Sequence, residues 1–209
     1  MTMQPTDVVA PPEAPASTPP ALITRARNIL LQPRPEWDRI AAEQAGVAGL
    51  YFGYLLPIAL VVGLIGFVSV SLFSGFLASW MIFAAAQAAF LIVSSLLGVF
   101  VIALIINAIA PAFGALPAAG QAHKLAVYSA TAFVISSVFS FGNTFATLGL
   151  IGLYSYGLLW IGLPRVMKPP ADKRLPYFAA IVVVSVVIAL LVAGLVQSLV
   201  GWGSPLYFR

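Results

Sequence analysis

The sequence contains no cysteine, one histidine and few charged residues. Without cysteine the chain has no disulfide, no thiol nucleophile and no thiolate metal site. Charged residues make up 8% of the chain and hydrophobic residues 61%, whereas about a quarter of the residues in a soluble domain are charged. This composition excludes a soluble fold and predicts a protein that is embedded in a membrane.

Charged side chains are absent from three long stretches, residues 44–123, 125–164 and 175–208. A charge at the centre of a membrane-spanning helix costs about 2.5–3.5 kcal/mol, and a helix of about 20 apolar residues crosses the hydrocarbon core. Five apolar runs lie in or at the edge of these stretches, at about 50–72, 77–110, 124–141, 145–163 and 177–200. We therefore predict an all-α membrane protein, with a bundle of five transmembrane helices in residues 45–200.

The residues before the first run divide into two parts. Residues 1–20 are rich in proline and small residues, which predicts a disordered cytoplasmic tail, and they lack the pattern of a signal peptide. Residues 21–44 carry apolar residues at helical spacing with an interruption at Pro33. This pattern predicts a short N-terminal amphipathic helix pair that lies along the cytoplasmic interface, with Trp37 at the depth of the lipid headgroups.

The basic residues flank the apolar runs instead of alternating with aromatic residues, so the net charge of +4 does not indicate a nucleic-acid partner. With a cytoplasmic N-terminus, five spans place nine of the ten Lys and Arg residues inside and leave only Arg209 outside. This distribution follows the positive-inside rule. We expect a multi-pass protein of the cell inner (cytoplasmic) membrane, with residues 201–209 as a short external tail.

Small residues and one proline mark candidate helix contacts. The first span begins with Gly49-x-x-x-Gly53, and this spacing permits close approach of two helices. Pro57 removes one backbone hydrogen bond and is expected to kink this span. Gly149 and Gly152 have similar small-residue spacing. Packing inside the bundle is the favoured role of all these positions, and a dimer face is the alternative.

Catalytic motifs are not found in the sequence. No His-Glu-x-x-His, Gly-x-Ser-x-Gly or phosphate-binding Gly-Lys string occurs, and the carboxylates lie outside the apolar runs. His123 has no acidic neighbour in sequence, so we expect it to be interfacial and solvated. We therefore predict no catalytic residue, no metal site and no cofactor.

Aromatic residues at the ends of the runs favour an interfacial belt over a quinone or cofactor site. This group consists of Tyr51, Tyr54, Trp160, Tyr177 and Trp202.

Three segments carry a resemblance to a known family. They are NILLQPRPEWDRIAAE at 28–43, FGYLLPIALVVGLIG at 52–66 and YSYGLLWIGLPRVMKPPADKR at 154–174. In this order they resemble the bacterial branch of the Yip family, the Ypt/Rab-interacting membrane proteins, over about residues 25–200. The resemblance implies five spans and a cytoplasmic N-terminus, and in eukaryotic members it implies Rab-GTPase binding and a role in vesicle traffic. The acidic Asp-Leu-x-Gly-Pro element of those members is absent here.

Together these observations favour a non-enzymatic scaffold or membrane-organising protein. Its predicted working surface is residues 21–44 with the loop 164–176, in contact with anionic lipid, a protein partner or a second copy of the chain. The candidate contact residues are Arg25, Arg27, Arg34, Trp37, Arg39, Lys168, Lys173 and Arg174. The alternative is a small transporter or channel component with a path lined by Gln87, Asn107 and neighbouring serines, although the spans lack the ionisable residues that ion coupling uses.

Overall fold

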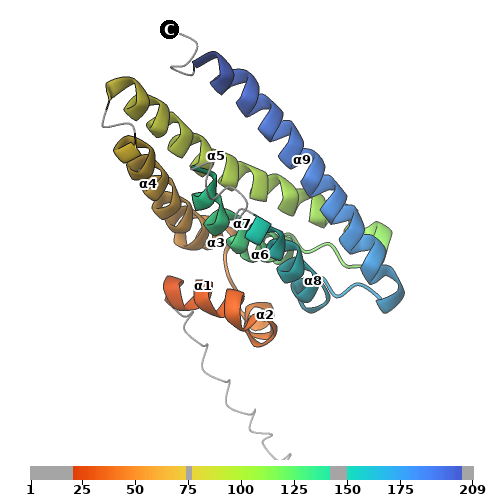
Figure 1. Cartoon of the computed structure of the whole chain (residues 1–209). Coiled ribbons are helices and arrows are strands. Elements are labelled where there is room, and N and C mark those ends of the chain that lie inside the picture. Colours follow the sequence, from red (N-terminus) through yellow and green to blue (C-terminus); the bar gives the residue numbers. More distant parts are fainter. Residues whose placement is uncertain (1–20, 74–76, 142–149, 204–209) are drawn as a thin grey trace, which may run out of the picture.

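The computed structural model describes residues 21–73, 77–141 and 150–203, and these residues fold into helices joined by short connections (Figure 1). Within these ranges the chain contains no strand. Four helices are long and apolar enough to cross a membrane, and a fifth apolar helix, Leu150–Val166, is shorter. The all-α membrane bundle that the charge-free stretches predict is therefore confirmed.

The N-terminal helix pair consists of α1 (Leu22–Leu31) and α2 (Pro33–Ala42). The residue before a proline is disfavoured in the helical region, and Gln32 accordingly has the non-helical angles φ −134° and ψ 59°. Pro33 has no N–H to leave unsatisfied and is well suited to the first turn of a helix. The prolines thus separate the two helices at the place that the sequence indicates.

The first long helix contains a π-helical turn. It runs from α3 (Val47–Leu50) through the π-helical turn η1 (Tyr51–Leu55) into α4 (Leu56–Phe73). Pro57 offers no N–H to the carbonyl four residues earlier, so the regular α-helical hydrogen-bond pattern cannot continue through Gly53. The widened turn lies directly before the proline and is the local consequence of that missing donor.

The second long helix, α5 (Ala78–Ile109), is followed by the 3₁₀ turn η2 (Ala110–Phe113). Its 32 residues correspond to about 48 Å, more than one hydrocarbon core requires. Pro111 does not continue the helix, and Gly114 adopts a φ of 70° with its Cα against the ring of Pro170. Only glycine takes this conformation readily, so the chain turns here towards the next helix.

The third and fourth apolar runs form shorter pieces. The third comprises α6 (Ala119–Ser129), α7 (Thr131–Ser136) and the 3₁₀ turn η3 (Ser137–Phe141). The fourth ends in α8 (Tyr154–Val166). After the basic loop and the 3₁₀ turn η5 (Ala171–Lys173), α9 (Arg174–Gly203) forms the last long helix.

Helices α5 and α6 make most of the contacts within the bundle. Helix α5 lies between α4 and α6, α6 contacts α8, and the N-terminal pair packs on α8 and α7 (Figure 1). Helix α9 joins the bundle at its start, where the hydroxyl of Tyr177 donates to the carbonyl of Ile106 at 2.7 Å and its ring stacks on Phe113. The remainder of α9 leaves large apolar side chains exposed, which suits contact with lipid.

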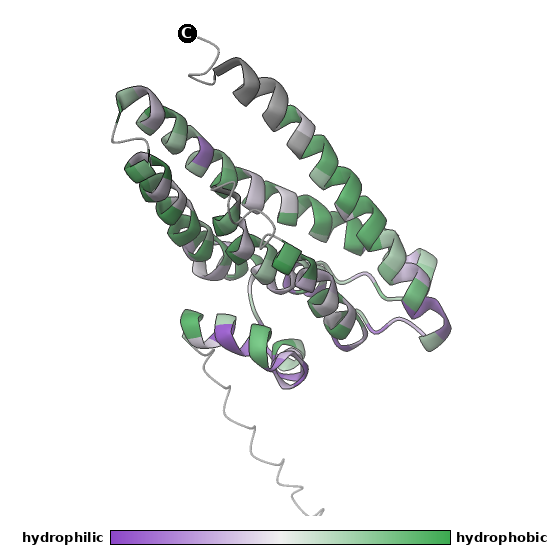
Figure 2. Ribbon diagram, in the orientation of Figure 1, coloured by the Kyte–Doolittle hydropathy of each residue, from purple (hydrophilic) through white to green (hydrophobic). Residues whose placement is uncertain are grey.

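Polar residues gather at one end of the bundle (Figure 2). Figure 2 shows most of the strongly hydrophilic residues on α1, α2 and the segment that leads into α9, while α4, α5 and α9 are mostly apolar apart from one hydrophilic position on α5. This end of the bundle holds the arrangement described next.

Candidate functional site

The N-terminal helices contact the bundle through four charged side chains, Arg25, Glu36, Glu43 and Lys124, which we call the buried charge cluster. Arg25 is only 2% exposed. One of its terminal nitrogens lies 3.1 Å from Glu36, and the other donates to both carboxylate oxygens of Glu43 at 2.6 and 2.7 Å. The planar guanidinium has several donors in a fixed geometry, so one arginine links α1, α2 and the segment after α2.

Glu36 is also nearly inaccessible, at 1% exposure. Its second oxygen accepts hydrogen bonds from the amide of Asn28 and from Arg39, both at 3.2 Å. The turn at Gln32 folds α2 back beside α1, and this brings Glu36 opposite Arg25 and Asn28. The carboxylate thus holds the two short helices together.

Lys124 connects the N-terminal pair to α6. This side chain is 3% exposed, and its ammonium donates to the carbonyls of Ile40, at 3.1 Å, and of Glu43. Ile40 lies in the last turn of α2, where carbonyls have no partner within the helix and where a cation is favoured by the helix dipole. Lys124 therefore satisfies the end of α2 from a residue more than 80 positions away.

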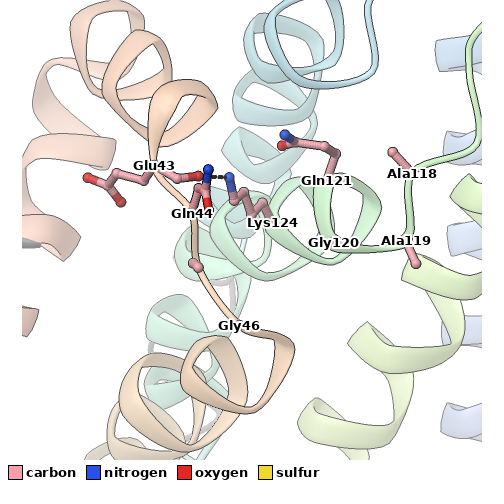
Figure 3. A pocket seen from close by; sticks show the side chains of 9 residues that line it. Glu43, Gln44, Gly46, Ala118, Ala119, Gly120, Gln121 and Lys124 are labelled. Carbon is pink, nitrogen blue, oxygen red and sulfur yellow. Dashed lines mark hydrogen bonds between the residues drawn. The ribbon is translucent and has the colours of Figure 1, made fainter. Parts of the chain in front are cut away.

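A shallow depression of about 490 Å³ lies beside this contact (Figure 3). It is formed by residues 43–46 after α2 and by residues 118–121 with Lys124 at the start of α6. Figure 3 shows the ammonium of Lys124 directed at the backbone of Glu43, whose carboxylate points away towards Arg25. The depression is therefore the outer edge of the buried charge cluster.

Aromatic and hydroxyl groups continue this contact into the bundle. The hydroxyl of Tyr51 and Nδ1 of His123 hydrogen-bond at 2.9 Å, and Tyr54 bonds Thr131 at 2.9 Å. The guanidinium of Arg25 lies 5.5 Å from the ring centre of Tyr128, in range for a cation–π interaction. Both tyrosines of the π-helical turn are thus tied to α6 and α7.

Trp37 packs against a glycine of α8. The indole is fully buried, and a Cβ placed on Gly162 would lie 2.6 Å from two of its ring carbons. Tyr128 contacts the other side in an edge-to-face arrangement at 6.3 Å. A nearby ion pair, Arg165 with Asp38 at 2.7 Å, also joins α8 to α2. The absence of a side chain at Gly162 is therefore what allows α2 to approach α8.

The outer face of the helix pair is basic and partly apolar. Glu36 and Glu43 turn inward, while the candidate contact residues Arg27, Arg34 and Arg39 are exposed. On α1, the spacing of four residues places Ile23 and Leu31 on the same side as Arg27, and these two apolar side chains are 79% and 69% exposed. This surface thus combines positive charge with apolar side chains.

Two of the predicted contact residues lie elsewhere than expected. Arg25 and Trp37 were predicted to meet lipid or a partner, but both are buried, because the charge of Arg25 is satisfied by two carboxylates and Trp37 fits against Gly162. In the basic loop, Lys168 and Lys173 are exposed and Arg174 is half-buried. The exposed members of the set remain available for the predicted contact.

Of the glycines predicted to pack against another helix, one lies at a close contact and two do not. Gly49 and Gly53 do not lie at a close helix contact, since a Cβ at either position would meet nothing within 4 Å. Gly152 does, because a Cβ there would lie 2.6 Å from the hydroxyl oxygen of Ser136. Pro57 follows the π-helical turn described above. Gly149 lies outside the described residues.

The predictions for the lone histidine and three of the aromatic residues are corrected. His123 is buried against Tyr51 and Phe100 instead of solvated. Tyr51, Tyr54 and Tyr177 are also buried, because each hydroxyl finds a partner inside the bundle. Trp160 is exposed and contacts Phe178, while the side chain of Trp202 lies outside the described residues.

Sequence reasoning missed Lys124 and Gly162 as members of this contact. Lys124 opens an apolar run, which is where an ordinary interfacial lysine is expected, and Gly162 resembles the other glycines of the spans. Glu36 and Glu43 need positive partners, but several arginines stand near them in the sequence. No local pattern therefore predicts that Lys124 is buried beside them.

In the part of the chain that the structure describes, no group of three or more His, Asp or Glu side chains lies close enough together to hold a metal ion. Gln87 and Asn107, the amide residues of the transport alternative, are half-buried on α5, and neither of them lines the depression beside Lys124. The arrangement as a whole is suited to hold two short helices against a membrane bundle and to present their basic face.

Comparison with known proteins gives one match to a protein family. The family model of the Yip1 domain matches residues 27–194, from the middle of α1 to the last third of α9. Neither the curated proteins nor the solved structures contain a match to the chain. The matched range includes the spans, α2 and every member of the buried charge cluster except Arg25.

Proposed function

This chain belongs to the Yip1 domain family, and from that membership we propose that it acts as a non-enzymatic membrane-organising protein whose basic helix pair contacts anionic lipid or a protein partner. Its apolar helices make it an integral membrane protein. The proposal concerns what the helix pair does at the surface of that membrane.

The observation that carries the proposal is the division of charge across the helix pair. Glu36 and Glu43 point inward to Arg25, whereas Arg27, Arg34 and Arg39 are exposed. The one exposed carboxylate of the pair in the described residues, Asp38, is bound to Arg165 of α8. A basic residue near an anionic membrane surface contributes about 1 kcal/mol to binding. Exposed apolar side chains at Ile23 and Leu31 flank Arg27 and suit the boundary between headgroups and acyl chains.

The attachment of the pair to the bundle supports the same proposal. Arg25, through the ring of Tyr128, and Lys124 and Trp37 connect α1 and α2 to the spans by buried contacts. A surface held in this way has less conformational freedom to lose when it binds, so more of the interaction free energy appears as affinity. We expect the exposed surface of α1 and α2 to act as one unit with the exposed lysines of the loop, Lys168 and Lys173.

The membrane and the orientation are part of the proposal. We propose the cytoplasmic membrane of a bacterium, with the N-terminus in the cytoplasm and the C-terminus outside, because this arrangement leaves most basic residues on the cytoplasmic side. The working surface would then face the cytoplasm.

The test removes exposed charge without touching the buried charge cluster, so Arg39, which donates to Glu36, is left in place. The double variant Arg27→Gln, Arg34→Gln and wild-type protein are crosslinked in the membrane and purified in mild detergent, and the associated lipids and proteins are quantified. We expect the double variant to recover several-fold less anionic lipid or partner, because two charges near the surface are lost.

The matched control replaces the same two residues with lysine, which keeps the charge. This control should recover as much lipid or partner as wild-type protein. Equal recovery with the glutamine variant would contradict the proposal. Purification with a small solute and with neither partner nor enriched lipid would instead favour the transport alternative.

A further inference from the structure

A second cavity lies inside the membrane-spanning part of the bundle, away from the helix pair. Its volume is about 430 Å³, and it lies among α5, α6, α7, α8 and α9. The lining is mainly apolar and includes Val99, Ile102, Phe133, Leu159 and Ile188. Of the residues of the transport alternative it includes the serines Ser94 and Ser95 of α5, but neither Gln87 nor Asn107. An apolar cavity of this kind favours an apolar occupant over water.

The position of the cavity limits what can fill it. Every helix around it belongs to an apolar segment, and the neighbouring side chains of α9, Val187, Leu190 and Leu191, are exposed towards the surroundings. In a bilayer those surroundings are lipid acyl chains. The volume equals that of about 14 water molecules at ~30 Å³ each, which is the scale of one acyl chain and far below that of a whole lipid.

A basic residue is aligned with the cavity along α9. Ile181, Ser185, Ile188 and Val192 line the cavity at spacings of four, three and four residues, so they share one face of the helix. Arg174 precedes Ile181 by seven residues, which places it on the same face about 10 Å nearer to the basic loop. That separation corresponds to the distance between the upper part of an acyl chain and its headgroup.

Arg174 is also incompletely satisfied. Its Nε is buried and has no hydrogen-bond partner among the described residues. Within the cavity, Ser129 is 6% exposed, and its hydroxyl likewise has no partner in the described part of the chain. A phospholipid offers acceptors of both kinds, phosphate oxygens for a guanidinium and ester carbonyls for a hydroxyl.

We propose that this cavity binds one acyl chain of an anionic phospholipid whose phosphate lies at Arg174. The inference deepens the proposed function, because it names a lipid that the bundle holds individually, but it uses residues outside the surface of α1 and α2. The cavity accommodates the acyl chain, and Arg174 favours a negatively charged headgroup.

The test uses a phosphatidylglycerol with a photoreactive diazirine in the middle of one acyl chain, in vesicles that contain the full-length protein. Phosphatidylcholine with the same labelled chain is the comparison lipid. Labelled residues are mapped by mass spectrometry. We expect labelling concentrated on cavity residues of both α5 and α9, and stronger for phosphatidylglycerol than for phosphatidylcholine.

Gly98→Phe fills the cavity. Gly98 lines it, and a Cβ there would meet nothing within 4 Å, so the added ring enters open space. Gly194→Phe is the matched control, because Gly194 also has open space but does not line the cavity. We expect labelling of the cavity residues to fall to background in Gly98→Phe and to remain in Gly194→Phe. Ala189→Phe fills the cavity from α9 and provides an independent variant if Gly98→Phe does not fold.

Arg174→Gln tests the headgroup. We expect cavity labelling by phosphatidylglycerol to fall about fivefold and labelling by phosphatidylcholine to stay unchanged. Equal labelling of the two lipids in wild-type protein would overturn the role of Arg174. The cavity site would be overturned if the label were spread evenly over the outer faces of the helices and if Gly98→Phe and Ala189→Phe did not change it. The Arg27 and Arg34 glutamine variant should keep its cavity labelling, so failure of the proposed function is distinguishable from failure of this inference.

Discussion

At the scale of single residues, the most consequential feature is that charged side chains are buried beside a membrane bundle. Moving a charge out of water costs several kcal/mol, and the attraction between partners compensates only when geometry and hydrogen bonding are good. Here two cations, Arg25 and Lys124, are matched by two carboxylates, Glu36 and Glu43, and by backbone carbonyls. The cluster therefore fixes where the helices meet more than it adds stability beyond what apolar residues would supply.

This reasoning predicts unequal effects for two acidic residues of the same helix. Glu36→Ala leaves the buried Arg25 with one partner fewer, and removal of one member of a buried pair costs about 3–5 kcal/mol. Asp38→Ala is the control, since Asp38 is 65% exposed and its pair with Arg165 is worth at most about 1 kcal/mol. Thermal unfolding in detergent and the rate at which trypsin cleaves α1 and α2 measure the difference. Equal losses would contradict the assignment of Glu36 to a buried pair.

At the scale of elements, α2 is held on α8 by shape. Trp37 occupies the space that a side chain at Gly162 would need, and both residues are buried. Interiors of proteins are close-packed, so an added methyl group at such a contact forces its neighbours to move. The contact is small, but it decides how near the N-terminal pair lies to the bundle.

Gly162→Ala is therefore expected to destabilise the contact by about 1–3 kcal/mol. The matched variant Gly49→Ala has open space around its Cβ, and alanine favours helix over glycine by about 1 kcal/mol, so it should be neutral or stabilising. Hydrogen exchange of the α2 amides reports on the contact directly, with faster exchange expected in Gly162→Ala only. Slow exchange in both variants would show that Trp37 moves aside without cost.

At the scale of the whole molecule, charge is distributed unevenly between the two ends of the bundle. The helix pair, Lys124 and the loop before α9 bring the basic residues of the described chain together, as Figure 2 shows for the most hydrophilic segments. Such an asymmetry is what orients membrane proteins, with the basic end in the cytoplasm.

This asymmetry predicts the labelling of single cysteines, which have no native thiol to compete with them. A cysteine at Ala171, which is exposed in η5, should react with a membrane-impermeant maleimide only after the cells are opened. A cysteine at Ser204 or Asn143, positions that follow from the sequence alone, should react on intact cells. Reaction at Ala171 from outside would contradict the proposed orientation.

The sequence by itself was sufficient for the class of fold and for the breaks at two prolines, but not for the bounds of the third and fourth apolar runs, which form shorter helices than expected. Charge-free runs identify membrane helices because the bilayer penalises charge strongly, and that penalty is local to each residue. Pro33 and Pro57 act on their own backbone, so the break between α1 and α2 and the irregular turn before Pro57 follow from position alone.

Only the tertiary structure decided which side chains of these elements face inward. Arg25 and Arg27 are two residues apart and look alike in sequence, yet one is buried and the other exposed, because Glu43 and Tyr128 lie beside Arg25 alone. Gly49 and Gly162 differ in the same way, since only Gly162 has Trp37 against it. A periodic pattern gives the spacing of a helical face, but the partners of that face lie outside the helix, 18 residues away for Glu43 and more than a hundred for Tyr128 and Gly162, and it is the partner that determines burial.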